Sequence, residues 1–408
     1  MMIEFVIEHL NEDTARLIMN KANWPDIDMN LAVNCIESRR KLKGKVQEWY
    51  DEPRLIFPRK ISAEQCSSSA TAQYKAQLAA DIAGSEGFTL ADLTGGFGVD
   101  SWFFSKKAGQ IVYCEMLEDL CQAARHNFSV LGADNIDVNN VQVSEIYLHE
   151  DASIFTRFKP DIVYLDPARR GEGGKKVFLL EDCTPDVLTL KDELFGHVQH
   201  ILLKLSPMAD ITMACRRLGP TCREVHVVAS GGECKELLIW LDRDWSKDYS
   251  IHAVELHANS PASKFSFIHN GSDGPSVPSS ETVRPGLFLF EPGKSLMKAG
   301  AFDLIASRFC INKLARSTHY YTTDSLEKAE SLQPYGKVFS ILDCLPLNKR
   351  SIRDIAQKYP KAEVTARNIP MDTDTLRKKS GIISGDDAHI FALKSDKEGN
   401  LLIAARRI

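Results

Sequence analysis

Three acidic residues, each at the end of a short apolar run, are the best placed to do chemistry. Asp92 opens the glycine-rich turn Asp-Leu-Thr-Gly-Gly-Phe-Gly, Glu115 ends the next apolar run, and Asp166 ends a third and precedes Pro167. Because the carboxyl ends of parallel strands meet at one edge of a sheet, we expect these three residues to face a common ligand crevice.

The glycine-rich turn predicts a nucleotide-like cofactor. Gly96 and Gly98 have no Cβ, so backbone N–H groups at the start of the following helix can approach a ligand closely. The spacing is not G-x-G-x-x-G, which disfavours nicotinamide or flavin. Glu115 lies 23 residues after Asp92, where such folds place a carboxylate that holds both ribose hydroxyls.

Alternating apolar runs and helical stretches predict the elements that position these residues. A helix is expected over Met116–Leu131, and a capping box of Ser62 and Gln65 predicts another over Ala63–Ala83. The order βαβα favours a parallel sheet with helices on both faces. The last two strands are joined only by Ser230–Lys235, which predicts an antiparallel hairpin at the sheet edge. The expected strands are Thr89–Leu93, Gln110–Glu115, Ile136–Val141, Asp161–Asp166, His200–Leu205, Glu224–Ala229 and Glu236–Asp242.

These motifs carry a resemblance to a known family. The turn that opens at Asp92 resembles the cofactor loop of class I methyltransferases that act on RNA, and Asp166-Pro-Ala-Arg resembles the Asp-Pro-Pro motifs of base methyltransferases. The chain is most similar to bacterial methyltransferases with a C-terminal THUMP-like domain. The resemblance also covers the segments Glu64–Ser68, Lys204–Pro207 and Glu233–Glu236 and the basic C-terminal region. It implies a Rossmann-like core with a seven-stranded, mostly parallel sheet, and S-adenosyl-L-methionine as cofactor.

The resemblance also implies roles for individual residues. Glu115 would bind the ribose hydroxyls, and the turn after the third strand offers only Ser144 and Glu145 near the adenine. On the acceptor side, Arg169 replaces the aromatic residue that stacks on the base, and an arginine plane can substitute for it. The residues that would surround the methionine and ribose are Asp92, Thr94, Gly95, Gly96 and Gly98. Those that would act on the acceptor are Asp166, Pro167 and Arg169.

An exocyclic amine is the expected methyl acceptor. Asp166 and the carbonyl of Pro167 can accept the amine hydrogens and direct the nitrogen lone pair at the methyl group. Methylation of a pyrimidine carbon needs a cysteine nucleophile. The resembling enzymes that do this have Cys-Asn-Pro where this chain has Leu205-Ser206-Pro207, so the nucleophile is expected to be absent. Two alternatives remain open: a protein or small-molecule methyltransferase, and an RNA-binding protein that binds the cofactor without transfer. Cys66, Cys183 and Cys234 are interpreted as inert.

Charge and composition predict the domains and the partner. We expect a helical region at 1–85, the methyltransferase core at 86–270 with extra strands after about 245, a linker at 271–282, and a ferredoxin-like or THUMP-like α+β domain at 283–408. This last domain has 21 lysines and arginines against 14 acids, a balance of +7, whereas the rest of the chain carries −12. Its basic runs at 349–353 and 377–379 favour binding to RNA, either rRNA or tRNA.

The remaining patterns concern location and other ligands. The apolar runs are too short to span a bilayer, and the N-terminus lacks the basic segment of a signal peptide. Ten cysteines stand singly, outside metal-ligand spacing, so we expect a cytoplasmic protein with neither a metal nor a membrane partner. A basic, aromatic-rich segment at 39–57 fits either a solvated helix face and turn or a nucleic-acid contact.

Overall fold

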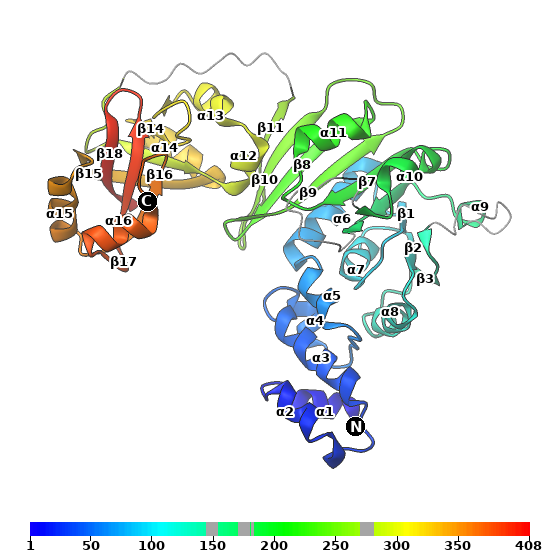
Figure 1. Ribbon diagram of the computed structural model, residues 1–408. Coiled ribbons are helices and arrows are strands. Elements are labelled where there is room, and N and C mark those ends of the chain that lie inside the picture. The colour runs from blue at the N-terminus through cyan, green and yellow to red at the C-terminus, as the bar shows by residue number, and fades with distance from the viewer. Residues whose placement is uncertain (144–153, 170–179, 181–182, 270–280) are drawn as a thin grey trace. The chain divides into compact units, whose positions relative to one another are not determined.

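The computed structural model describes residues 1–143, 154–169, 180, 183–269 and 281–408, with only the backbone described at Thr156 and Arg169. The chain forms two compact units (Figure 1). Unit 1 comprises Met1–His226 and Lys235–Ser250, and unit 2 comprises Val227–Cys234 and Ile251–Ile408. Each unit is described by itself below.

Unit 1 begins with helices, and one predicted helix is divided in two. Instead of a single helix over Ala63–Ala83, α5 ends at Gln65 and α6 begins at Ser69, because Cys66 adopts an extended backbone. The capping box is formed by Ser68 and Thr71 rather than by Ser62 and Gln65. The N-terminal helices are α1 (Met2–Glu8), α2 (Thr14–Met19), α3 (Met29–Leu42), α4 (Gln47–Asp51), α5 (Lys60–Gln65) and α6 (Ser69–Ala83).

The basic, aromatic-rich segment serves the packing of this helical region. Arg39 is buried, and its guanidinium donates hydrogen bonds to four backbone carbonyls between residues 50 and 55, at 2.6–3.2 Å. Trp49 and Phe57 are fully buried and stack on each other. These two aromatic rings are therefore closed to stacking with a base, and the nucleic-acid interpretation fails for them and for Arg39.

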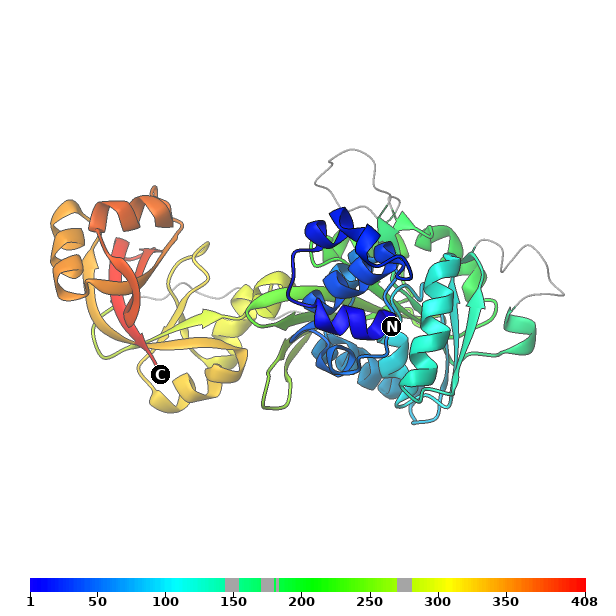
Figure 2. The same ribbon diagram turned by 90° about the horizontal axis from the view of Figure 1, so that it is seen from below.

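The core of unit 1 is a mostly parallel sheet. Helices lie on both of its faces, with α6, α7 and α8 on one side and α10 and α11 on the other (Figures 1 and 2). β1 pairs in parallel with β2 and β4, and β4 with β7, whereas β9 runs antiparallel to β7. The strands follow the order β8-β9-β7-β4-β1-β2-β3. The helices are α7 (Val99–Ser105), α8 (Glu118–Val130), α9 (Ile154–Arg157), α10 (Val187–Leu194) and α11 (Ile211–Leu218).

The expected strands are all present. They are β1 (Thr89–Asp92), β2 (Gln110–Glu115), β3 (Ile136–Asn140), β4 (Ile162–Leu165), β7 (His200–Leu205), β8 (Cys222–Ser230) and β9 (Glu233–Asp242). Gly231 and Gly232, both with positive φ, form the tight turn between β8 and β9, as the predicted hairpin requires. The fold class is confirmed, but the sheet has nine strands, because β10 (Ser250–Leu256) and β11 (Ser263–Ile268) continue the order beyond β8. The hairpin is therefore not the edge of the sheet.

Unit 2 contains a second, seven-stranded sheet with the order β13-β14-β12-β15-β18-β17-β16. Two apolar clusters, one around Phe339 and Phe391 and the other around Ile355 and Ile390, form its core. Its strands are β12 (Phe288–Pro292), β13 (Asn312–Lys313), β14 (Tyr321–Thr323), β15 (Gly336–Pro346), β16 (Lys361–Arg367), β17 (Ile383–Ser395) and β18 (Gly399–Arg407). Its helices are α12 (Lys294–Ala299), α13 (Phe302–Phe309), α14 (Leu326–Leu332), α15 (Lys349–Lys358) and α16 (Thr373–Ser380). Within the described ranges, every helix is too short or too polar to cross a membrane.

Candidate cofactor and acceptor site

A cavity of about 1160 Å³ opens in unit 1 at the carboxyl ends of the central strands. Ligand pockets typically measure about 300–1,000 Å³, so this one has room for a cofactor and an acceptor together. Eight of the nine predicted site residues line it: Asp92, Thr94, Gly95, Gly96, Gly98, Glu115, Asp166 and Pro167. The ninth, Arg169, belongs to the short strand β5 (Ala168–Arg169), which pairs with β6 (Cys183–Thr184). Its side chain, like Ser144 and Glu145, lies outside the described residues.

Hydrogen bonds join the two predicted motifs. Asp92 accepts from the backbone N of Thr94 at 3.1 Å and from Ser101 Oγ at 2.5 Å, and Thr94 Oγ1 accepts from the backbone N of Asp166 at 2.7 Å. Burial raises the pKa of Asp92 to about 7. Asp92 thus fixes the loop from inside, and Thr94 links the cofactor loop to the acceptor residue.

The three glycines of the loop serve different purposes. A Cβ on Gly95 would lie 2.2 Å from the Tyr113 ring, and one on Gly98 would lie 2.9 Å from Phe128. These two positions need glycine for packing. Gly96 has φ +57° and open space around it, with only a carbonyl at 3.6 Å. Of the three, Gly96 is the cavity-lining position where an added side chain would meet open space.

Glu115 is oriented by the backbone around it. Its Oε2 accepts from the backbone N of Gly96 at 2.9 Å and its Oε1 from the backbone N of Leu117 at 2.8 Å. Each carboxylate oxygen has a second lone pair, so both can still accept from a hydroxyl. The predicted ribose contact is therefore compatible with the geometry.

The walls of this end of the cavity are apolar. Ile61 and Met116 line it and expose 52% and 57% of their surface. Ile61 belongs to α5, so the N-terminal helical region contributes to the cavity, which the sequence did not predict. This end of the cavity suits an adenosine cofactor. It offers a carboxylate for the ribose, apolar side chains for a flat ring, and a loop with open space at Gly96.

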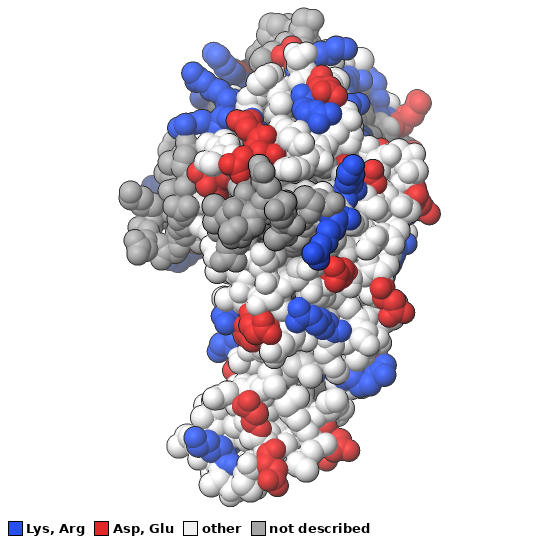
Figure 3. All heavy atoms as spheres, turned by 90° about the vertical axis from the view of Figure 1, so that its right-hand side faces the viewer, with Lys and Arg blue, Asp and Glu red and all other residues white. Residues whose placement is uncertain are grey.

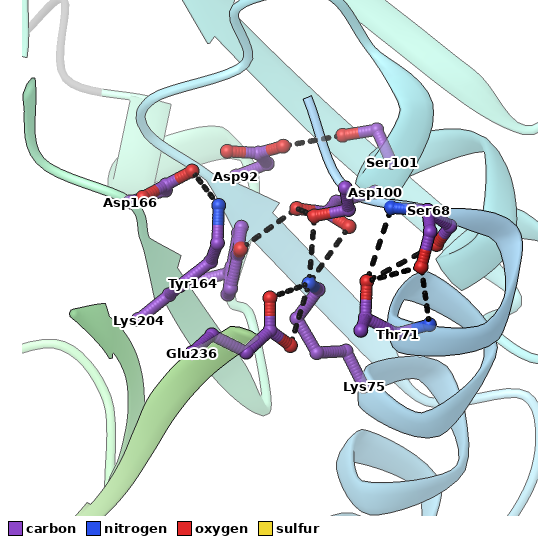
Figure 4. Close-up of polar contacts among 11 residues, drawn as sticks. Ser68, Thr71, Lys75, Asp92, Asp100, Ser101, Tyr164, Asp166, Lys204 and Glu236 are labelled. Carbon is purple, nitrogen blue, oxygen red and sulfur yellow. Dashed lines mark hydrogen bonds and ion pairs between the residues drawn. The ribbon is translucent and has the colours of Figure 1, made fainter. Parts of the chain in front are cut away.

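The other end of the cavity is ionic. Lys204, in β7, donates a hydrogen bond from Nζ to Asp166 Oδ2 (Figure 4). The Lys204 side chain is 12% exposed and that of Asp166 is 37% exposed. Burial lowers the pKa of Lys204, but three neighbouring carboxylates, led by Asp166, outweigh burial and raise it above its usual value. Lys204 is therefore a permanent cation at the acceptor residue.

A buried polar cluster lies behind this ion pair. Lys75, fully buried in α6, donates to Glu236 of β9 at 2.8–2.9 Å and lies 3.2 Å from Asp100 Oδ1. Asp100, in the first turn of α7, also accepts from Tyr164 Oη at 2.9 Å and from Ser67 Oγ at 3.0 Å. Figure 4 shows the side chains of Lys75, Glu236, Asp100 and Tyr164 converging from α6, β9, α7 and β4. Their mutual contacts offset the cost of burying the charges.

Lys204, Lys75, Asp100 and Glu236 were absent from the predicted site. One signal in the sequence could have identified two of them: Lys204 and Glu236 lie in short segments that carry the family resemblance away from the recognised motifs. Lys75 gave no such signal, because a lysine in a long alanine-rich helix is ordinarily exposed.

Two domain models match the C-terminal part of the chain. Residues 288–329 match a ferredoxin-like domain, described as PG_1098_Fer, and residues 336–407 match a THUMP domain-like model. The predicted THUMP-like domain is confirmed. No curated protein matches the sequence significantly.

One solved structure matches nearly end to end. It is described as a putative methyltransferase from Porphyromonas gingivalis W83, with 28% identity and a TM-score of 0.85, covering 100% of this chain and 97% of that one. The fold is therefore a methyltransferase fold followed by a THUMP-like domain, as the resemblance implied. Two further matches are too weak to carry an argument. An rRNA methylase from Streptococcus thermophilus has 11% identity, 40% and 93% coverage and a TM-score of 0.30. The T. thermophilus 16S rRNA N2 G1207 methyltransferase has 14% identity, 44% coverage of each chain and a TM-score of 0.31.

Proposed function

We propose that this protein transfers a methyl group from S-adenosyl-L-methionine to an exocyclic amine of a base in RNA. The observation that carries the proposal is the position of Asp166 and Pro167 in the same cavity as Glu115 and the loop at Asp92–Gly98. A cofactor on Glu115 and an acceptor at Asp166 would then share one cavity, and alignment of the two reactants supplies most of the catalysis.

The residues of the chain have separate tasks in this reaction. The bound cofactor would supply a methyl group carried on a positively charged sulfur. After giving up the methyl group, this sulfur is a neutral thioether. Glu115 holds the ribose hydroxyls. Asp166 and the carbonyl of Pro167 accept the two amine hydrogens, so that the nitrogen lone pair points at the methyl carbon. When the new N–C bond forms, the nitrogen loses a proton, which Asp166 accepts.

A covalent route through cysteine is disfavoured by the environment of the two thiols that line the cavity, Cys66 and Cys114, because burial raises the pKa of both. Cys66 lines the cavity, but burial raises its pKa to about 11, so it is a thiol at neutral pH. We expect no denaturant-resistant adduct between the protein and RNA containing 5-fluoropyrimidines. An adduct that forms with the wild-type protein but not with Cys66→Ala would favour methylation of a pyrimidine carbon instead.

RNA is the proposed acceptor because of charge. On the face drawn in Figure 3, basic and acidic side chains are interspersed. In unit 2, α15 and α16 pack against each other and expose six basic side chains. Arg350 and Lys358 pair with acidic residues of the same unit, and the other four are Lys349, Arg353, Lys378 and Lys379. With the +7 balance of residues 283–408, these suit contact with phosphates.

The direct test is transfer of tritium from labelled S-adenosyl-L-methionine to total RNA of a strain that lacks the gene. We expect label in RNA from this strain and much less in RNA from its parent, where the sites are already methylated. Label in free small molecules or in protein, with none in RNA, would contradict the proposal and favour the other methyltransferase classes. Cofactor binding without transfer to any acceptor would favour an RNA-binding protein.

A further inference from the structure

Asp166 and Lys204 form an adjacent acceptor and donor at the cavity wall. β4 and β7 are parallel with Leu165 opposite Leu203, so the next residues along, Asp166 and Lys204, are neighbours on the same face. Both line the cavity. The carboxylates of Asp100 and Glu236 lie on the same side of Lys204 as the buried cluster (Figure 4), and both raise the pKa of Lys204. The ammonium is therefore held at the wall by fixed negative charge.

The pair has unused hydrogen-bonding capacity. Among the described residues, the side chain of Lys204 donates one hydrogen bond, from Nζ to Asp166 Oδ2, and Oδ1 of Asp166 accepts none. An ammonium has three N–H groups and a carboxylate oxygen has two lone pairs. The wall thus offers one acceptor beside one donor. Asparagine and glutamine side chains offer the same pair when they hold adenine by an amine hydrogen and the adjacent ring nitrogen.

We propose that Lys204 is a specificity-determining residue that selects adenine or cytosine as the methylated base. In both bases the exocyclic amine adjoins an unprotonated ring nitrogen. Asp166 would accept from the amine while Lys204 donates to that nitrogen. On the Watson–Crick edge of guanine the amine adjoins N1–H, a donor, which would face the ammonium. The other neighbour of that amine, N3, lies close to the ribose. This inference rests on the proposed amine transfer.

The first test identifies the methylated nucleoside. RNA labelled by the full chain is digested to nucleosides and separated by mass. N6-methyladenosine or N4-methylcytidine is expected. N2-methylguanosine would overturn the role of Lys204 while leaving amine transfer intact. Label on a ring carbon, a ring nitrogen or a ribose, or no label at all, would overturn the proposed function and this inference together.

The second test asks whether Lys204 contacts the ring nitrogen. Once the methylated site is known, short RNAs carry either the natural base or a deaza analogue at that site. The analogue has C–H in place of the ring nitrogen beside the amine: 1-deaza- or 7-deazaadenine, or 3-deazacytosine. The wild-type protein should lose about tenfold to a hundredfold in kcat/KM on one such analogue, because a hydrogen bond to a charged donor is lost. Lys204→Met should be slow on the natural base and no slower on the analogue.

Two comparisons decide the outcome. Lys107→Met removes a lysine that pairs with Glu86 at the surface, away from the cavity, and should discriminate between the RNAs as the wild type does. If Lys204→Met still discriminates like the wild type, Lys204 does not contact the ring nitrogen and the inference fails. If that variant does not fold, the wild-type comparison alone decides. Equal kcat/KM on the natural base and on every analogue would overturn the inference.

Discussion

The two ends of the cavity are built in different ways. At the cofactor end, the loop between Asp92 and Gly98 and the carboxylate of Glu115 are fixed by hydrogen bonds that the carboxylates accept, most of them from backbone N–H groups. At the acceptor end, Asp166 is held mainly by Lys204, behind which lies a cluster of buried charges from elements far apart in the chain.

This difference predicts different responses to mutation. At the cofactor end, where backbone groups form the site, substitutions that leave the loop conformation intact should be tolerated. Cofactor binding should be lost only where a new side chain fills the space. A charge cluster fails when one member is removed, because its partners remain buried without compensation. The predictions below test this contrast from the largest expected effect to the smallest.

Asp166→Ala should have the largest effect. We expect kcat for RNA methylation to fall about 10²- to 10⁴-fold, the usual contribution of a positioned acid or base, with cofactor affinity within a few-fold of wild type. Single-turnover transfer and calorimetry with S-adenosylhomocysteine measure the two quantities. Asp192→Ala removes an exposed aspartate that pairs with Lys191, and should change neither. Normal turnover in Asp166→Ala would show that the Asp-Pro segment only ends the strand and takes no part in catalysis.

Lys75→Met should be the most destabilising change at the acceptor end. It leaves the buried carboxylates of Asp100 and Glu236 without the cation that contacts both directly, so we expect a loss of about 3–5 kcal/mol in the free energy of unfolding, measured by urea denaturation. Lys107→Met breaks a surface pair instead and should cost less than about 1 kcal/mol. Adding Glu236→Gln to Lys75→Met should recover part of the loss. Equal losses for the two lysines would show that the cluster is not a unit.

The same contrast explains how much could be predicted from the sequence. The strands, the hairpin and the cofactor end follow from local signals, because Asp92, Gly96 and Glu115 lie at strand ends within one βαβ segment. Apolar periodicity and glycine spacing report such features directly. The split between α5 and α6 was missed because one extended residue, Cys66, ends a helix that composition alone would continue.

The acceptor end depends on contacts that no local pattern encodes. Lys75 and Glu236 are 161 positions apart, and each taken alone has the sequence signature of a surface residue. Only the tertiary fold, which brings α6, α7 and β9 together, buries them. Asp166 was identified by its proline, but its partner Lys204 was not, since the register that aligns β4 with β7 is a tertiary property.

Gly96→Asp should weaken cofactor binding strongly with a modest loss of stability. The aspartate side chain would enter open space beside Glu115. There it would occupy the volume that the cofactor needs and repel the carboxylate of the cofactor. We expect the affinity for S-adenosylhomocysteine, measured by calorimetry, to fall by at least about tenfold, and a strain of about 1–2 kcal/mol from the left-handed backbone. Gly95→Ala is the matched comparison. Its Cβ would clash with Tyr113, so it should lower stability more than Gly96→Asp does. Unchanged affinity for S-adenosylhomocysteine in Gly96→Asp would show that this loop does not bind the cofactor.

The smallest effect is expected for the basic surface of unit 2. Arg377 is half-buried and pairs with Glu363 at 3.2 Å, whereas the next two residues on α16, Lys378 and Lys379, are exposed. The two lysines, rather than Arg377, should therefore contact phosphates. Changing both to alanine should weaken binding to all RNA sequences alike, by a few-fold at moderate salt.

The salt dependence of that binding distinguishes a phosphate contact from general damage. Each phosphate contact on single-stranded RNA contributes about −0.7 to the slope of log affinity against log salt concentration. Removing Lys378 and Lys379 should therefore flatten the slope by about 1.4, while S-adenosylhomocysteine still binds with wild-type affinity, since the cavity belongs to unit 1. The matched control replaces Lys21 and Lys247, two exposed lysines of unit 1, and should leave the slope unchanged. If both double variants flatten the slope equally, RNA responds to total charge rather than to α16. If neither does, RNA binds elsewhere, and a protein or small-molecule acceptor becomes the better candidate.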